Sequence, residues 1–209
     1  QCPWSSITRS FRKAETGRIT VRTETLGHGQ LPQVEMKTDR LLLRRWRQAD
    51  REPFSVLNAD PEVMRFFLKP LSREESDVFA DRIEAHFVRN SFGLWAVEIL
   101  GSASFIGFIG LSIPKFEAVF TPCVEIGWRL ALRFWNRGYA SEGARAVLEF
   151  GFQVLKLREI VSFTSVSNLP SRRVMEKIGM TRDLGGDFDH PSIPEGNPLR
   201  SHVLYWLYK

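Results

Sequence analysis

The chain has 209 residues, of which 43% are hydrophobic and 25% are charged. This length and composition support one substantial hydrophobic core, and we expect a single main domain. No run approaches the roughly 18 consecutive apolar residues that a membrane-spanning helix needs, and the N-terminal residues lack the apolar core of a signal peptide. These features argue against a membrane or secreted protein, and we expect a soluble protein of the cytoplasm.

The formal net charge is +5 at pH 7. The Lys and Arg residues are scattered along the chain rather than gathered with aromatic residues on one basic face. We therefore expect no nucleic-acid partner, and an anionic ligand is the more economical explanation of the charge. Cys2 and Cys123 are the only cysteines. Their number and separation predict neither a disulfide framework nor a metal site.

Residues 1–35 differ from the rest of the chain. Ser, Thr, Arg, Gly and Gln dominate them, and apolar residues are too sparse to define a buried face. We expect a poorly ordered N-terminal extension or a remnant of processing. The main domain is predicted to span residues 36–209.

The first part of the main domain is predicted to hold a short strand followed by helices. The strand is the apolar run within residues 40–44. Asp60 before Pro61 and Ser72 before Glu75 are helix-start signals, and the second is a capping box. The predicted helices span residues 48–57, 61–67 and 72–87.

The second part is predicted to form most of the sheet. Three strands follow one another closely, and the tight Gly101-Ser102 turn favours antiparallel pairing. A long amphipathic helix beginning near Ala140 then requires a crossover to the next strand. A Gly- and Pro-rich loop over residues 185–198 precedes the closing strand. The predicted strands span residues 94–100, 105–113, 122–130, 159–166 and 202–208, and the fold class is mixed α+β.

Two strand-to-helix junctions are suited to a phosphorylated ligand. The strand ending at Leu130 leads through the basic turn 135–138 into the long helix. The strand ending near Val166 leads through residues 167–171 into a shorter helix that ends at Gly179. The first N–H groups of a helix lack internal partners, and the helix dipole attracts anions. These junctions predict a pyrophosphate-binding site.

Residues 37–209 carry a set of motifs in a fixed order. They are Glu125-Ile126-Gly127-Trp128, Trp135-Asn136-Arg137-Gly138-Tyr139-Ala140-Ser141-Glu142, Asn168 with Ser171, and Glu176-Lys177-Ile178-Gly179-Met180. With this order and spacing, the chain resembles the RimJ/RimL type of the GNAT superfamily of N-acetyltransferases. The resemblance implies the GNAT fold, a mixed, mostly antiparallel twisted sheet with flanking helices in which a splayed pair of strands holds acetyl-CoA.

The resemblance also implies how acetyl-CoA binds. Backbone groups of Trp128 and Leu130 would pair with the pantetheine arm like an added strand, and the turn at Gly138 would cradle the pyrophosphate. Asn136 replaces the glycine more usual there, and Asn tolerates a left-handed φ. Asn168 would cap its helix, bind the pantetheine arm, or do both. The implied cofactor-binding residues are Trp128, Arg129, Leu130, Trp135, Asn136, Arg137, Gly138, Tyr139, Ala140, Ser141, Asn168 and Ser171.

Glu125 and Ser171 are the implied catalytic residues. Attack of a neutral amine on the thioester needs a base, and Glu125 could act directly or through water. The alternative for Glu125 is a structural ion pair or hydrogen bond. Many relatives have a Tyr seven positions after the Asn to protonate the leaving thiolate, but Met175 occupies that position here. Ser171 is the substitute proposed in the RimL-like branch, and its alternative role is to cap the helix.

The implied acceptor is a primary amine, either a small molecule or a protein N-terminus. Asp189 and His190 lie where the family places a wall of the acceptor pocket, so they could bind the amine or provide the base. We expect no metal ion, and either a monomer or a homodimer. Because the Tyr position is lost, the alternative function is a catalytically weak acyl-CoA-binding module that regulates a partner.

Overall fold

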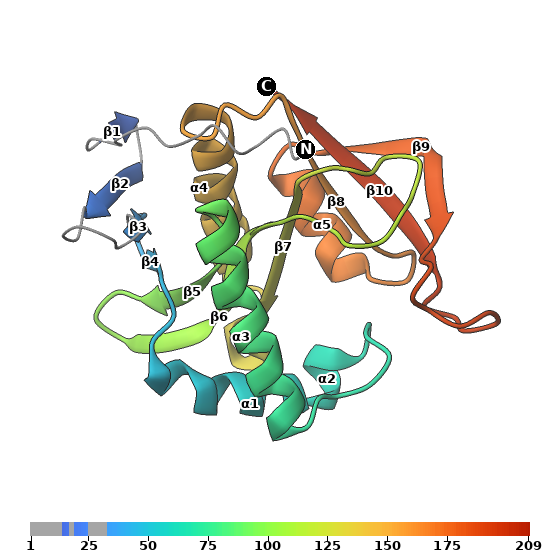
Figure 1. Cartoon of the computed structure of the whole chain (residues 1–209), viewed down its shortest axis with the longest axis horizontal. Helices are drawn as coiled ribbons and strands as arrows, with labels where there is room; N and C mark the ends of the chain where they lie inside the picture. The colour runs from blue at the N-terminus through green and yellow to red at the C-terminus, as the bar shows by residue number, and fades with distance from the viewer. Residues whose placement is uncertain (1–13, 17–18, 25–32) are drawn as a thin grey trace.

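The computed structural model of the chain describes residues 14–16, 19–24 and 33–209. They form one ten-stranded sheet in the order β1-β2-β3-β4-β5-β6-β7-β8-β10-β9 (Figure 1). Neighbouring strands are antiparallel, except that β7 and β8 are parallel. The strands are β1 (Ala14–Thr16), β2 (Ile19–Glu24), β3 (Gln33–Lys37), β4 (Leu41–Arg44), β5 (Leu94–Ile99), β6 (Ala103–Ser112), β7 (Glu125–Leu130), β8 (Glu159–Ser165), β9 (Thr181–Asp189) and β10 (Ser201–Tyr208).

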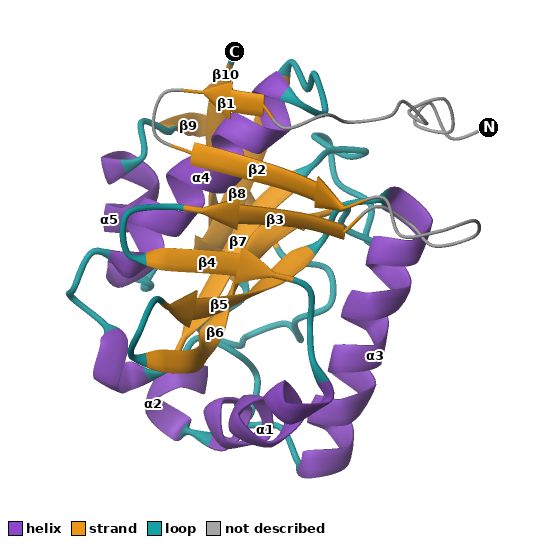
Figure 2. Cartoon of the chain, turned by 90° about the vertical axis from the view of Figure 1, so that its left-hand side faces the viewer, coloured by secondary structure: helices purple, strands orange, loops and turns teal. Residues whose placement is uncertain are grey.

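Helices lie against both faces of the sheet (Figure 2). On one face, α4 lies so close that a Cβ atom added at Gly143 would be 2.5 Å from Cδ1 of Ile109 on β6. On the other face, Phe54 of α1 and Phe79 of α3 pack edge-on against Phe108 of β6. The helices are η1 (Gln48–Asp50), α1 (Arg51–Ala59), α2 (Pro61–Met64), α3 (Arg73–Asn90), η2 (Leu132–Phe134), α4 (Tyr139–Gln153) and α5 (Leu169–Lys177).

The predicted α+β fold with its antiparallel meander is confirmed. The meander is β5-β6-β7, and the crossover helix α4 connects β7 to β8. The helix-start signals are also confirmed, because Asp60 accepts the N–H of Glu62 at 2.9 Å and Ser72 accepts that of Glu75 at 3.2 Å. The capping box thus sets the start of α3, which shields one face of the sheet.

The structure differs from the sequence prediction in the C-terminal hairpin. Strand β9 runs from Thr181 to Asp189, where we expected the loop to begin at residue 185. This strand lies at the edge of the sheet and includes Gly185 and Gly186. An edge strand is held by its partner β10 alone, so its sequence need not carry the apolar alternation that predicts a strand.

The structure also bears on the predicted N-terminal extension. Strand β3 begins at Gln33, before the expected domain boundary at residue 36, and pairs with both β2 and β4. Residues 1–13, 17–18 and 25–32 of the extension lie outside the described residues. The boundary at residue 36 stays a prediction.

Candidate active site

Strands β7 and β8 are paired at one position and then separate. Their single register pair is Glu125 with Val161, and the Val161 N–H donates to the carbonyl of Val124 at 2.9 Å. Because the two strands are parallel, they open toward their C-terminal ends, where α4 and α5 begin. The splayed strand pair that the resemblance implies is therefore present within the sheet, between its seventh and eighth strands.

The register of β7 on β6 identifies which backbone groups face the opening. Ala131 N–H donates to the carbonyl of Ile106, so the pair Leu130–Gly107 is not hydrogen-bonded and the backbone of Leu130 points away from β6. By alternation, Trp128 also points its N–H and carbonyl into the opening. The Leu130 carbonyl accepts the indole N–H of Trp135 at 2.7 Å. The backbone groups of Trp128 have no partner among the described residues, so they form a free edge.

The turn before α4 has the backbone conformation expected of an anion-binding loop. Asn136 has φ 58° and Gly138 has φ 82°, both left-handed. The N–H groups of Tyr139, Ala140 and Ser141 form the first turn of α4, and no side chain caps it. Arg137 is exposed beside them. These N–H groups are therefore available to an anion at the mouth of the opening.

Arg40, in the turn between β3 and β4, contacts the turn before α4 and the first residues of that helix. Its guanidinium binds Glu142 of α4, with Nη2–Oε2 at 2.6 Å and Nε–Oε2 at 2.7 Å. Nη1 also donates to the carbonyl of Arg137 at 3.1 Å, and the guanidinium lies 4.6 Å from the ring centre of Tyr139. The sequence motifs gave no sign of this support, because residues 40 and 142 are far apart in the chain.

At the start of α5, the capping role of Asn168 is confirmed. Its Oδ1 accepts the Ser171 N–H at 3.3 Å, and its Nδ2 donates to Oγ1 of Thr164 at 2.8 Å. The hydroxyl of Ser171 has no hydrogen-bond partner among the described residues. Met175 is 1% exposed and belongs to the core. Ser171 thus lies near the open end of β8 with an uncommitted hydroxyl.

Glu125 lies at the point where β7 and β8 separate. Its carboxylate accepts the hydroxyl of Ser112 at 3.3 Å and has no ion-pair partner among the described residues. Burial raises the pKa of Glu125 to about 8, against the smaller lowering effect of the Ser112 hydrogen bond. A carboxyl group with such a pKa can exchange a proton near neutral pH, as a general base must.

The side chains of β7 alternate between the two faces of the sheet. Trp128 pairs with Ile109, so both face α4, whereas Glu125, Gly127 and Arg129 face α1 and α3. Arg129 was implied as cofactor-binding, but its backbone faces β6 and its side chain is buried on the face opposite α4. Its position therefore differs from that of Trp128 and Leu130, whose backbone groups face the opening.

The side chains of Asp189 and His190 have different partners, and their predicted role in binding the acceptor stays a prediction. Asp189 ends β9 and pairs with Arg200 at 3.1 Å. His190 contacts Phe116 instead, with ring centres 4.6 Å apart.

His190 belongs to an aromatic cluster that the sequence analysis missed. Burial lowers the pKa of His190 and of His202, the two histidines of the cluster, so both favour the neutral form. Phe116 and Phe120 come from the loop between β6 and β7, and their spacing of four was the only local signal. The cluster comprises Phe116, Phe120, Phe163, Phe188, His190 and His202.

Comparison with known proteins decides the family. The family model of the acetyltransferase (GNAT) domain matches residues 40–181, more than half of the chain. The chain belongs to the GNAT family of N-acetyltransferases. The uncharacterized N-acetyltransferase YnaD of Bacillus subtilis is 31% identical over 82% of this chain and 95% of its own length. The FsC-acetyl coenzyme A-N(2)-transacetylase of Aspergillus fumigatus is 32% identical over 71% of this chain and 66% of its own length.

A solved structure agrees with this assignment. The GNAT-family acetyltransferase of Bacillus anthracis superposes with a TM-score of 0.68 at 30% identity, covering 83% of this chain and 98% of that one. The resemblance found in the sequence motifs is therefore confirmed, and this GNAT protein is an N-acetyltransferase of a family that uses acyl-CoA.

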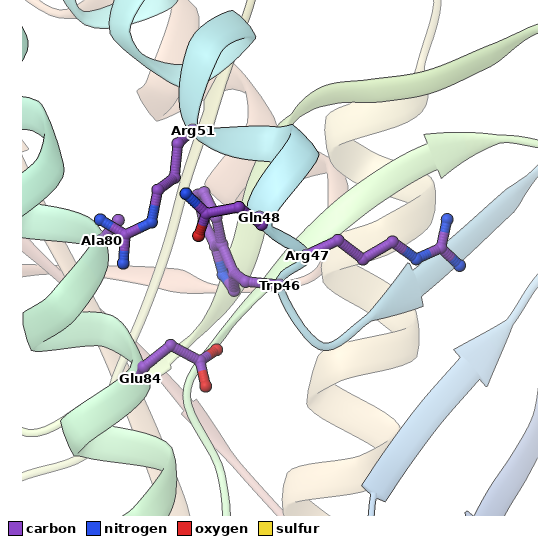
Figure 3. Close-up of a pocket in the computed structure, with 6 residues that line it drawn as sticks. All are labelled: Trp46, Arg47, Gln48, Arg51, Ala80 and Glu84. Atoms are coloured by element: carbon purple, nitrogen blue, oxygen red, sulfur yellow. The ribbon is translucent and has the colours of Figure 1, made fainter.

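The GNAT chain has a separate small cavity of about 150 Å³ between η1, α1 and α3 (Figure 3). Two of the residues that line it are already paired, Arg51 with Asp81 and Glu84 with Arg45. None of the predicted site residues lies there, and we do not assign it to the active site. Its lining residues are Trp46, Arg47, Gln48, Arg51, Ala80 and Glu84.

The described residues of the GNAT chain contain neither a metal-binding cluster nor a membrane-spanning helix. In residues 14–16, 19–24 and 33–209, no three His, Cys, Asp or Glu side chains gather closely enough to hold a metal ion. Over the same residues, no helix is both long and apolar enough to cross a membrane.

Proposed function

We propose that this protein transfers the acetyl group of acetyl-CoA to a primary amine by direct attack of the amine on the thioester. The observation that carries the proposal is the free edge of β7 opening onto the uncapped first turn of α4, with the Glu125 carboxyl group where the strands part. The acyl-CoA donor of the family and the printed name of the Aspergillus relative support acetyl-CoA as the donor.

The chain's own residues would hold the two parts of acetyl-CoA. The backbone groups of Trp128 and Leu130 would pair with the amides of the pantetheine arm, as in strand addition. The N–H groups at the start of α4 and the exposed Arg137 would bind the pyrophosphate. Because Asn136 and Gly138 adopt left-handed φ values, the backbone of this turn already has the curved form that an anion site requires.

The same residues account for the chemical step. Glu125 takes the proton from the attacking ammonium group, directly or through water, so that the neutral amine forms the new C–N bond. A backbone N–H near Trp128 stabilises the oxyanion as the C–S bond breaks. The thiolate leaves and takes up a proton, for which the uncommitted hydroxyl of Ser171 is the candidate donor on α5. The acceptor in this proposal is a small-molecule amine or a protein N-terminus.

The test combines binding with turnover. Calorimetry should detect acetyl-CoA binding, and a panel of amines should release free CoA thiol, with the acetylated amine confirmed by mass spectrometry. Binding of acetyl-CoA without thiol release on any amine would favour the alternative, a regulatory acyl-CoA-binding module. The specific observation behind that alternative is the buried Met175 at the position where many relatives carry a Tyr.

A further inference from the structure

Arg129 is a buried cation that lacks an anionic partner. Its side chain is 9% exposed, and among the described residues it forms no ion pair. Nη1 donates to Oδ1 of Asn58 at 2.5 Å, and the ring of Phe67 lies 4.1 Å from the guanidinium carbon. A buried charge without a counter-ion is costly, so its presence calls for a ligand that offsets the cost.

The unpaired groups of Arg129 lie on one edge of the guanidinium. Nε is buried and has no hydrogen-bond partner, and Nη2 has none among the described residues. The N–H bonds of Nε and Nη2 run side by side, so together they form a fork that fits the two oxygens of a carboxylate. Asn58 occupies Nη1 and so leaves this fork free. A planar anion is the ligand that the fork is shaped to bind.

Arg129 also lies on the same side of β7 as the proposed base. Glu125, Gly127 and Arg129 alternate along one face of the strand. Gly127 has no side chain, and a Cβ atom built on it would meet only Oε1 of Glu125, at 3.8 Å. Apart from Glu125, no side chain therefore covers the strand at Gly127, between Glu125 and Arg129. A glycine within a strand often marks the place where a ligand approaches the backbone.

We propose that the acceptor is a primary amine that also carries a carboxylate. The free fork of Arg129 binds the carboxylate while Glu125 receives the proton of the amine across Gly127. This inference rests on the proposed function, since it assigns the substrate class of the same site. Two of the acidic residues of β9 are already neutralised by arginines, because Asp187 pairs with Arg182 and Asp189 with Arg200.

The experiment compares matched acceptors on the wild-type enzyme. Each amino acid of a series with one to four carbons between amine and carboxylate is paired with its own amide, and kcat/KM is measured by thiol release at one pH. We expect the acid to exceed the amide by at least about tenfold for the best spacing. The amine of each amide has a lower pKa than the amine of the matching acid, so more of it is neutral and able to attack at the same pH. This difference favours the amide and therefore works against the expected result.

A variant then assigns the preference to Arg129. Arg129→Gln should bring the ratio of kcat/KM for the acid to kcat/KM for the amide close to one, whereas Arg82→Gln on the exposed part of α3 removes the same charge and should keep the wild-type ratio. Thermal unfolding and acetyl-CoA affinity show whether Arg129→Gln is folded. If this variant is not folded, the comparison of acids with their amides on the wild-type enzyme decides whether the acceptor carries a carboxylate.

Two results would overturn the inference in distinguishable ways. Equal kcat/KM for acids and amides would exclude carboxylate recognition and leave the acetyltransferase proposal standing. If no amine released thiol, the proposed function would fail, and calorimetric binding of the same pairs to the CoA complex would decide the inference. Equal affinity of acid and amide in that measurement would overturn it.

Discussion

Arg44 and Arg129 are both buried arginines on the sheet, and they have opposite surroundings. Arg44 is 1% exposed and binds both oxygens of Asp50, at 2.8 and 2.9 Å, and also Glu98 at 3.0 Å. Although burial lowers the pKa of Arg44, the hydrogen bonds to Asp50 and Glu98 outweigh that effect and leave it raised. For Arg129, burial alone lowers the pKa to about 10. One guanidinium is neutralised within the fold, and the other is left with an open fork.

Asp50 and Glu125 differ in the same way as the two arginines. Asp50 is buried against Arg44 and also accepts the N–H of Arg47 at 2.7 Å, so it joins β4 to η1. Glu125 has one weak hydrogen bond and a pKa of about 8. Arg44 and Asp50, which bind each other, join elements of the fold, whereas Glu125 and Arg129 have no ion-pair partner among the described residues and lie on one face of β7. This contrast predicts which substitutions change activity and which change stability.

The largest effect is expected at Glu125. In its proposed role as general base, Glu125 acts in the transition state, so Glu125→Gln should lower kcat/KM by about 10²–10⁴ and leave acetyl-CoA affinity within a few-fold. In the wild type, kcat/KM should rise with pH through about 8, as the carboxyl group loses its proton. Glu125→Gln should lose this rise in kcat/KM on the acidic side of the pH profile. Ser171→Ala should lower the maximum value of kcat/KM but leave the pH of the rise unchanged. Full turnover of Glu125→Gln with an unchanged rise would make Glu125 structural.

The raised pKa of Glu125 also predicts the sign of a stability change. Between its ordinary pKa and about 8, the folded state keeps a proton that the unfolded state releases. The free energy of unfolding therefore falls as pH rises through this range. Glu125→Gln should remove that fall, so the variant should be more stable than the wild type at pH 9 in urea titrations. A parallel pH dependence in both proteins would contradict the assigned pKa.

Substitution of Arg44 should lower stability and leave ligand binding unchanged. Arg44→Met leaves Asp50 buried without its partner, which typically costs about 3–5 kcal/mol of unfolding free energy. Because Arg44 is far from the open edge of β7 in the sheet order, the folded fraction should bind acetyl-CoA with unchanged affinity. Denaturant unfolding and calorimetry measure the two quantities. A stable variant with weakened binding would erase the contrast between the two arginines.

Gly138 tests the proposed pyrophosphate-binding turn. Gly138→Val should weaken acetyl-CoA binding by more than about tenfold, because a β-branched residue disfavours the φ of 82° that orients the first turn of α4. Gly101→Val is a matched control, since Gly101 has φ 70°, nothing lies within 4 Å of its added Cβ, and it is in the β5–β6 turn. Both variants carry similar backbone strain. Equal loss of affinity in both would place the effect in the fold rather than in the site.

The sequence predicted the elements whose causes are local. The strands of the meander, the caps at Asp60, Ser72 and Asn168, and the turn before α4 depend on nearby residues and were found. The environment of Arg129 depends on Asn58 and Phe67, which the fold brings from α1 and the segment after α2. Read along β7 alone, Arg129 looked like part of a cofactor-binding strand. Its missing partner became visible only in three dimensions.

The smallest effect is expected at Arg40, whose surroundings are intermediate between those of Arg44 and Arg129. Its side chain is 47% exposed, and it is paired with Glu142 and with the carbonyl of Arg137 in the turn before α4. A pair this exposed contributes about 1 kcal/mol or less to stability, so Arg40→Ala should lower unfolding free energy by that amount and weaken acetyl-CoA binding only a few-fold. Arg40→Lys keeps the charge and should recover part of the stability but not the contact with Arg137.

The pH dependence of this last variant provides its check. Burial raises the pKa of Glu142, but its hydrogen bonds from Thr38 and Arg40 outweigh that effect and leave the pKa below its ordinary value. The pair therefore contributes stability above the ordinary pKa of a Glu and loses it as pH falls through the lowered value. The difference in unfolding free energy between wild type and Arg40→Ala should shrink toward zero in acid. A difference that stays constant with pH would mean that Arg40 acts through packing on Tyr139 rather than through its ion pair.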